Sequence, residues 1–141
     1  RRAPRSVVDL DAEGGGGGAV LVSCGVDGKV RRWDAETGKP TLAGGAQAFD
    51  VESPTAEQPL QIGAAGAEDL CFVPEAALLA AYCCRSGALL CRLAAHTGAV
   101  ACAEALPGCA RILSGGEDGR LLVWRAQAAA AAAGKDVICL D

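Results

Sequence analysis

A histidine, a serine and an aspartate that lie close together in the sequence are the residues of this chain that could do chemistry. His96 is the only histidine, and Ser114 and Asp118 follow it. A hydrolase uses such a set when the histidine takes the proton of the serine while the carboxylate orients the imidazole. The nucleophile must then be exposed beside an oxyanion hole. Because Ser114 lies in an apolar, strand-like run, we expect a structural role for these side chains and keep a hydrolase as an alternative.

Eight cysteines are a second group that could bind a metal or react: Cys24, Cys71, Cys83, Cys84, Cys91, Cys102, Cys109 and Cys139. Structural zinc sites commonly use Cys-x2-Cys pairs, and no two of these cysteines have that spacing. We expect no metal and no cofactor, and we interpret the cysteines as reduced, buried thiols. Cys84 and Cys91, each beside an arginine, give the only hints of a lowered thiol pKa, and we assign them no redox role.

The composition excludes several classes of partner. The chain of 141 residues carries 13 Lys and Arg against 17 Asp and Glu, for a net charge of −4. Because the basic residues are scattered, nucleic acid is not an expected partner. No apolar run reaches the ~18 residues of a membrane-spanning helix, so we expect a soluble protein of the cytoplasm or nucleus and no membrane contact. The chain begins at Arg1 and contains no Met, which favours a processed chain or a gene fragment.

Two similar segments must position the candidate residues. VSCGVDGKVRRWD begins at Val22 and LSGGEDGRLLVWR begins at Leu113, and they align without a gap, 91 residues apart from Trp33 to Trp124. In each, a β-prone run leads into an Asp-Gly pair that tolerates a positive φ, and a second run ends in tryptophan. Both segments therefore predict a β-hairpin.

The spacing of the two hairpins predicts a third unit between them. The offset equals about two propeller blades of ~40–45 residues. The best candidate is 76–100, in which Tyr82 replaces the tryptophan and a turn at Gly87 leads to an outer strand. A competing register ends an inner strand near Pro74 and puts Gly87 at the hairpin turn, but it leaves no outer strand before His96. We prefer the first register.

The fold class that follows is all-β, with about three four-stranded antiparallel blades. One further strand is expected after each hairpin, in the segments GKPTL and GKDVICL. The expected blades cover about 5–43, 46–93 and 96–141. Three stretches are typical of insertions or loops, namely 14–18, about 52–66 and 128–133. The glycine-rich first stretch lacks the Lys-Ser/Thr ending of a phosphate loop, so we interpret it as a linker.

The spacing of His96, Ser114, Asp118 and Trp124 resembles the WD40 repeat. In that family these residue types form a hydrogen-bonded tetrad that fixes the geometry of a blade. The first hairpin is similar to a partial tetrad, with a serine, an aspartate and a tryptophan but no preceding histidine: Ser23, Asp27 and Trp33. The resemblance implies a β-propeller scaffold that binds other proteins and is not an enzyme.

The departures from the family pattern limit what else the resemblance implies. Propellers of this family usually close with seven blades, so three blades need further blades in the same chain or in another chain. Some members act as substrate-recognition subunits of cullin-RING ubiquitin ligases and dock through Trp-Asp-x-Arg, which makes this the alternative function. Here Glu36 follows Trp33 and Asp34 where arginine is needed, and Gln127 stands there after Trp124.

Overall fold

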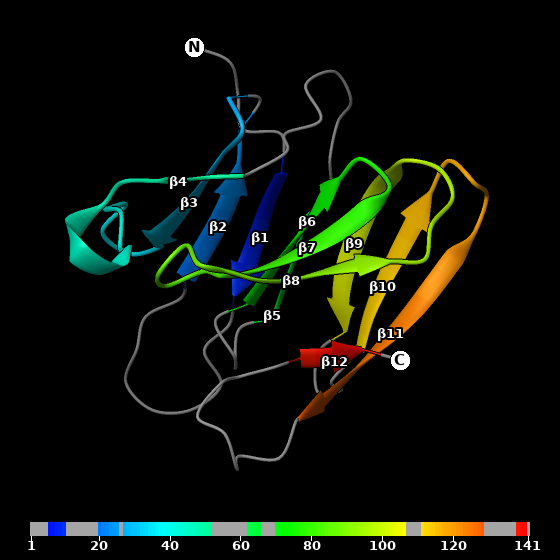
Figure 1. Cartoon of the computed structure of the whole chain (residues 1–141). Coiled ribbons are helices and arrows are strands. Elements are labelled where there is room, and N and C mark those ends of the chain that lie inside the picture. Colours follow the sequence, from blue (N-terminus) through cyan, green and yellow to red (C-terminus); the bar gives the residue numbers. More distant parts are fainter. Residues whose placement is uncertain are drawn as a thin grey trace.

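The computed structural model describes residues 6–10, 20–25, 27–51, 62–65, 70–106, 111–128 and 138–140. These residues form three antiparallel sheets of four strands, and within each sheet the strands lie in chain order. Figure 1 shows the sheets fanned side by side, the first in blue and cyan, the second in green and the third mostly in yellow and orange. In the described residues, no helix is long and apolar enough to cross a membrane.

The first sheet contains β1 (Ser6–Leu10), β2 (Val20–Cys24), β3 (Lys29–Asp34) and β4 (Phe49–Asp50). The expected hairpin is present, because β2 pairs with β3 and Gly28 takes a φ of 70° in the turn. The expected outer strand after Gly38 is reduced to an isolated bridge between Trp33 and Pro40. The chain then leaves the sheet through the 3-10 helix η1 (Ala43–Gly45).

The first sheet regains its outer strand later than the sequence predicted. Phe49–Asp50, which the sequence assigned to the second blade, pairs with Lys29 and Val30 of the first sheet. Gly44 and Gly45 take φ values of 71° and 74° and turn the chain out of the ladder. An outer strand interrupted by such a turn has no strand-like sequence pattern, which explains the error.

The second sheet contains β5 (Gly63–Ala65), β6 (Leu70–Glu75), β7 (Leu78–Cys83) and β8 (Leu89–Ala94). Tyr82 lies in the third strand and Gly87, with a φ of 76°, lies in the turn before the outer strand, as the preferred register predicted. β5 falls inside the stretch 52–66 that we expected to be an insertion. The backbone of β5 pairs with β6, so β5 is the inner strand of the second sheet.

The third sheet contains β9 (Val100–Leu106), β10 (Arg111–Gly116), β11 (Leu121–Ala128) and β12 (Ile138–Leu140). The second hairpin pairs β10 with β11, and the segment that contains GKDVICL supplies the outer strand β12, which pairs with the end of β11. Of the expected loops, 14–18 and 129–133 lie outside the described residues, while Ala128 ends β11.

The second sheet is packed on both faces, which explains why β6 is buried along its whole length. One hydrophobic cluster joins the first and second sheets, with Val22 and Val30 against Val73. The other joins the second and third sheets, with Phe72 against Trp124 among others. Alternate residues of a strand face opposite sides, so β6 serves both clusters. The fold class is confirmed as an open arc of three propeller-like blades.

Candidate functional site

The third sheet brings the four predicted tetrad residues into one hydrogen-bonded chain. Ser114 comes from β10, Trp124 from β11, Asp118 from the turn between them and His96 from the β8–β9 connection. The indole Nε1 of Trp124 donates to Ser114 Oγ at 2.7 Å, and Ser114 Oγ lies 2.8 Å from His96 Nε2. His96 Nδ1 lies 3.1 Å from each carboxylate oxygen of Asp118.

Local sequence explains how the histidine fits over the hairpin. The imidazole of His96 is fully buried, and it packs directly above Gly116 at the end of β10. A Cβ on Gly116 would lie 2.7 Å from His96 Nδ1, which is closer than van der Waals contact allows. Glycine at this position is therefore required by the close approach of the ring, and no backbone strain needs to be invoked.

The carboxylate of Asp118 is held ionised by its hydrogen bonds. The backbone N–H of Thr97 donates to it at 2.9 Å, and this bond is the main reason that the pKa of Asp118 falls to about 2, with His96 and the N–H of Arg120 adding to it. An ionised carboxylate can only accept, so His96 Nδ1 carries the proton between them. In a neutral ring, Nε2 then accepts from the hydroxyl of Ser114.

This proton arrangement is also that of a hydrolase, but access to the serine differs. Ser114 is 1% exposed, and its oxygen already accepts the indole N–H of Trp124. A nucleophile must meet a substrate carbonyl beside oxyanion donors, and a hydroxyl covered by tryptophan and histidine does not present itself to one. The geometry therefore gives these buried polar groups the hydrogen-bond partners that they need.

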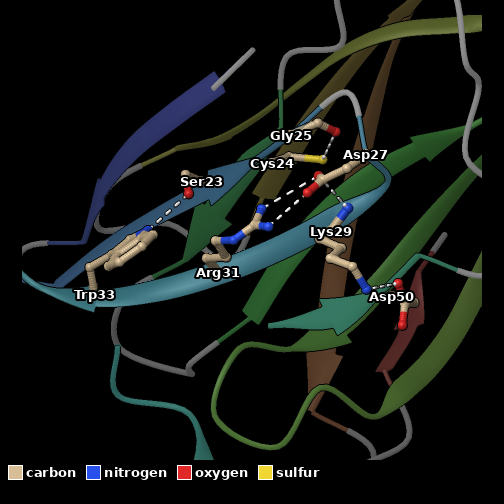
Figure 2. Close-up of polar contacts among 8 residues, drawn as sticks. All are labelled: Ser23, Cys24, Gly25, Asp27, Lys29, Arg31, Trp33 and Asp50. Atoms are coloured by element: carbon tan, nitrogen blue, oxygen red, sulfur yellow. Dashed lines mark hydrogen bonds and ion pairs between the residues drawn. The ribbon is translucent and has the colours of Figure 1, made fainter. Parts of the chain in front are cut away.

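The first sheet holds only part of this arrangement (Figure 2). Trp33 Nε1 donates to Ser23 Oγ at 2.9 Å, the same bond as in the third sheet. Asp27 lies apart from that pair and forms an ion pair with Arg31, with 2.7 Å between Oδ2 and Nη2. This guanidinium is the main cause of the lowered pKa of Asp27. Of the three predicted residues, the structure joins Ser23 and Trp33 but not Asp27.

The second sheet has a different buried network that the sequence did not predict. The hydroxyl of Tyr82 donates to Glu75 Oε1, and Arg92 Nε on β8 donates to Glu75 Oε2 at 3.0 Å. Glu75 is 1% exposed although its side chain ends in a carboxyl group. A charged residue at the end of an otherwise apolar strand was the one available signal, since such residues are rarely buried without partners.

Among the cysteines whose side chains the structure describes, none forms a disulfide. The pKa of Cys71 is raised well above its usual value by its hydrogen bond with Cys84 and by burial. A thiol with a raised pKa is a poor nucleophile. Among the described residues, no group of three His, Cys, Asp or Glu side chains could hold a metal ion. Cys109 and the side chain of Cys139 lie outside the described residues.

The comparison with protein families agrees with the tetrad geometry. Residues 87–125 match the family described as WD domain, G-beta repeat. This segment is similar to a WD40 repeat. It starts just before β8 and ends within β11, so the repeat includes the outer strand of the second sheet and three strands of the third. The matched segment therefore joins two neighbouring sheets, and His96 lies at that junction.

The fold of this chain is similar to that of solved structures, among them one of WD40 repeats. The crystal structure of the RRP9 WD40 repeats has a TM-score of 0.66 and 14% identity, covering 97% of this chain. The structure of U3-55K has a TM-score of 0.63 and 14% identity, covering 98%. The chain spans 38% of the length of each of these two structures. No curated protein sequence matches the chain.

Proposed function

We propose that the chain is a WD40 scaffold that binds other proteins, and that His96, Ser114, Asp118 and Trp124 form a structural tetrad without a catalytic role. The observation that carries this proposal is the burial of Ser114 Oγ between the indole of Trp124 and the imidazole of His96. WD40 repeats generally serve as protein-interaction scaffolds, which supports the same conclusion.

The tetrad supports binding because it holds two loops together at one end of the sheets. Asp118 accepts the N–H of Thr97 from the β8–β9 connection, and Glu117 N donates to Ala99 O at 2.8 Å. Loops that are fixed before binding lose less conformational entropy when a partner docks. Thr97, Glu117 and Arg120 are exposed on these loops. We propose that this end of the third sheet contacts the partner protein.

Reversing charges on these loops tests the binding surface. The variant Glu117→Arg/Arg120→Glu changes the exposed loops but none of the four tetrad side chains. Its matched control is Glu36→Arg, which reverses an exposed charge at the opposite end of the strands. We expect the first variant to lose most proteins that the wild-type chain retains in affinity capture, and the control to keep them. Equal retention by both variants would contradict the proposed surface.

The alternative to a general scaffold is a substrate-recognition subunit of a cullin-RING ubiquitin ligase. The order of the two hairpins with a degenerate unit between them resembles the C-terminal part of WD repeat-containing protein 53. Ligase docking through Trp-Asp-x-Arg needs an arginine where this chain has Glu36. Asp34 is also engaged, because its carboxylate accepts the backbone N–H groups of Glu36 and Thr37. We therefore favour the general scaffold, and recovery of a cullin adaptor with the chain would favour the receptor.

A further inference from the structure

Two buried cysteines of the second sheet are hydrogen-bonded to each other. Cys71 of β6 pairs across the ladder with Tyr82, and Cys84 follows Tyr82 by two residues. Alternate residues of a strand share a face, so the two thiols lie diagonally across the β6–β7 pair. Both cysteines are 0% exposed and belong to the cluster between the first and second sheets, and their side chains share a hydrogen bond. Two thiols in contact are the groups from which a disulfide forms.

Only the fold brings these two thiols together. They come from neighbouring strands, and the one sign of reactivity in the sequence was the arginine that follows Cys84. Cys83 pairs with Leu70, which belongs to the cluster between the second and third sheets, so this cysteine lies on the other face. Cys71 therefore faces Cys84 and not Cys83.

The turn that contains Cys84 also holds the outer part of the first sheet. The carbonyl oxygen of Arg85 accepts the N–H of Ala43 at 2.8 Å. Phe49 packs so closely on Gly87 that a Cβ there would lie 2.7 Å from the Cβ of Phe49. In Figure 1, η1 lies beside the turn that joins β7 to β8. The position of this turn is therefore coupled to the first sheet.

We propose that hydrogen peroxide oxidises Cys71 and Cys84 to a disulfide, and that this bond releases the segment 42–49 from the second sheet. Cys84 lies beside the exposed Arg85, so its thiolate attacks the peroxide first. The O–O bond breaks, a sulfenic acid forms, and the leaving hydroxide takes the proton that Cys84 released and becomes water. The sulfur of Cys71 then attacks that of Cys84, the S–O bond breaks, and the hydroxyl group leaves as water with the proton of Cys71. The two thiols lose two electrons, which the peroxide gains.

The state of Cys71 agrees with this order of events. Its hydrogen bond with Cys84 and its burial raise the pKa of Cys71 well above the usual value. Cys71 therefore keeps its proton and reacts only once a sulfenic acid lies next to it. The resting pair stays reduced, as the sequence predicted for the cysteines.

The disulfide requires the turn to move. Diagonal neighbours in an antiparallel pair have Cα atoms about 7–8 Å apart, whereas a disulfide needs about 4.4–6.8 Å. Cys71 is held by pairing with β5 on one side and β7 on the other, while Cys84 lies just beyond the end of β7. The turn therefore moves towards β6 and draws the carbonyl of Arg85 out of its bond with Ala43. Because residues 43–47 are exposed, oxidation changes this part of the surface, whichever protein the scaffold binds.

Peptide mapping of the full 141-residue chain after treatment with hydrogen peroxide tests the disulfide. Free thiols are alkylated, and the chain is cleaved after arginine and glutamate. Cleavage after Glu75 separates Cys71 from Cys84, so only a disulfide can keep the two peptides together. We expect this linked pair of peptides, and we expect its loss in Cys84→Ala. The matched control Cys83→Ala changes the neighbouring cysteine and should keep the link. A link from Cys71 to Cys24, which shares its cluster, would tie the two sheets together and contradict the release.

Amide hydrogen exchange in the unmutated chain tests the release and does not depend on the folding of a variant. The N–H of Ala43 should exchange about 2- to 10-fold faster after oxidation, because it loses one hydrogen bond. The control is the N–H of Val100, which donates to Ala76 O at 2.7 Å and connects the second sheet to the third. Its exchange should not change, and a reducing agent should restore the original rate at Ala43.

Three results would each overturn the proposal. The first is a failure of hydrogen peroxide to join Cys71 and Cys84. The second is a disulfide between them that leaves the exchange of Ala43 unchanged. The third is a faster exchange of Ala43 that persists in Cys84→Ala treated with hydrogen peroxide, because that variant has no disulfide to form at this position.

Discussion

Replacing Ser114 by alanine separates a structural tetrad from a catalytic triad. The substitution removes the oxygen that accepts from Trp124 Nε1 at 2.7 Å and lies 2.8 Å from His96 Nε2. The indole N–H of Trp124 and Nε2 of His96 then lack this partner, and both residues are buried. At about 0.5–1.5 kcal/mol for each lost bond, we expect the free energy of unfolding to fall by about 1–3 kcal/mol.

The assay for this prediction is urea denaturation followed by far-ultraviolet circular dichroism. Ser23→Ala is the matched control, because Ser23 makes the single corresponding bond to a half-buried tryptophan. We expect it to cost about 0.5–1.5 kcal/mol. In a Trp124→Phe background, the cost of Ser114→Ala should shrink, since one of its two bonds is already absent. Equal costs for Ser114→Ala and Ser23→Ala, or a hydrolytic activity lost by Ser114→Ala without loss of stability, would refute the structural role.

Three further substitutions test the buried networks. The variant Asp118→Asn should lose less thermal stability in acid than the wild-type chain does. The pKa of Asp118 is about 2 in the folded chain against 3.8 unperturbed. The stability that its ionised carboxylate contributes is therefore present above pH 3.8 and is lost as the pH falls towards 2. A melting series from neutral to acid pH, with the exposed Asp50→Asn as control, checks this. Gly116→Ala should lower the free energy of unfolding by about 1–3 kcal/mol, because the added Cβ pushes against the imidazole of His96. It should also shift the ring resonances of the histidine. The control Gly119→Ala strains only a positive φ and should leave those resonances in place. Tyr82→Phe should cost about 1.5–3 kcal/mol in urea denaturation, because a buried carboxylate loses its hydroxyl donor, and an unchanged stability would argue against that network.

The sequence predicted the parts of the fold whose local chemistry and tertiary role agree. Gly28 and Gly119 each follow an aspartate and take φ values of 70° and 71° in equivalent turns. Both hairpins could therefore be predicted from the sequence. The spacing from His96 to Trp124 placed four residues that the structure joins by hydrogen bonds. Tyr82 was placed in the correct strand because an outer strand had to fit before His96.

The remaining features depend on tertiary contacts that no local pattern encodes. The burial of Glu75 depends on Tyr82 and Arg92, which come from two later strands. In the first and third sheets, Gly25 and Gly116 occupy the corresponding strand ends and leave room for the aspartate of the turn. In the second sheet Glu75 occupies this strand end, so the carboxylate comes from the strand and not from the turn. The inner strand Gly63–Ala65 lacks β-branched side chains, so its composition favoured a loop.

The central claim is that three separate sheets pack face to face as propeller blades, with the tryptophan of the third sheet against the second. Nuclear Overhauser contacts from the indole protons of Trp124 in the full chain test it most directly. We predict contacts to apolar side chains of the second sheet, such as Phe72 and Leu79, which share its cluster. Contacts from Trp124 to its own sheet alone would contradict this packing and with it the propeller-like arc.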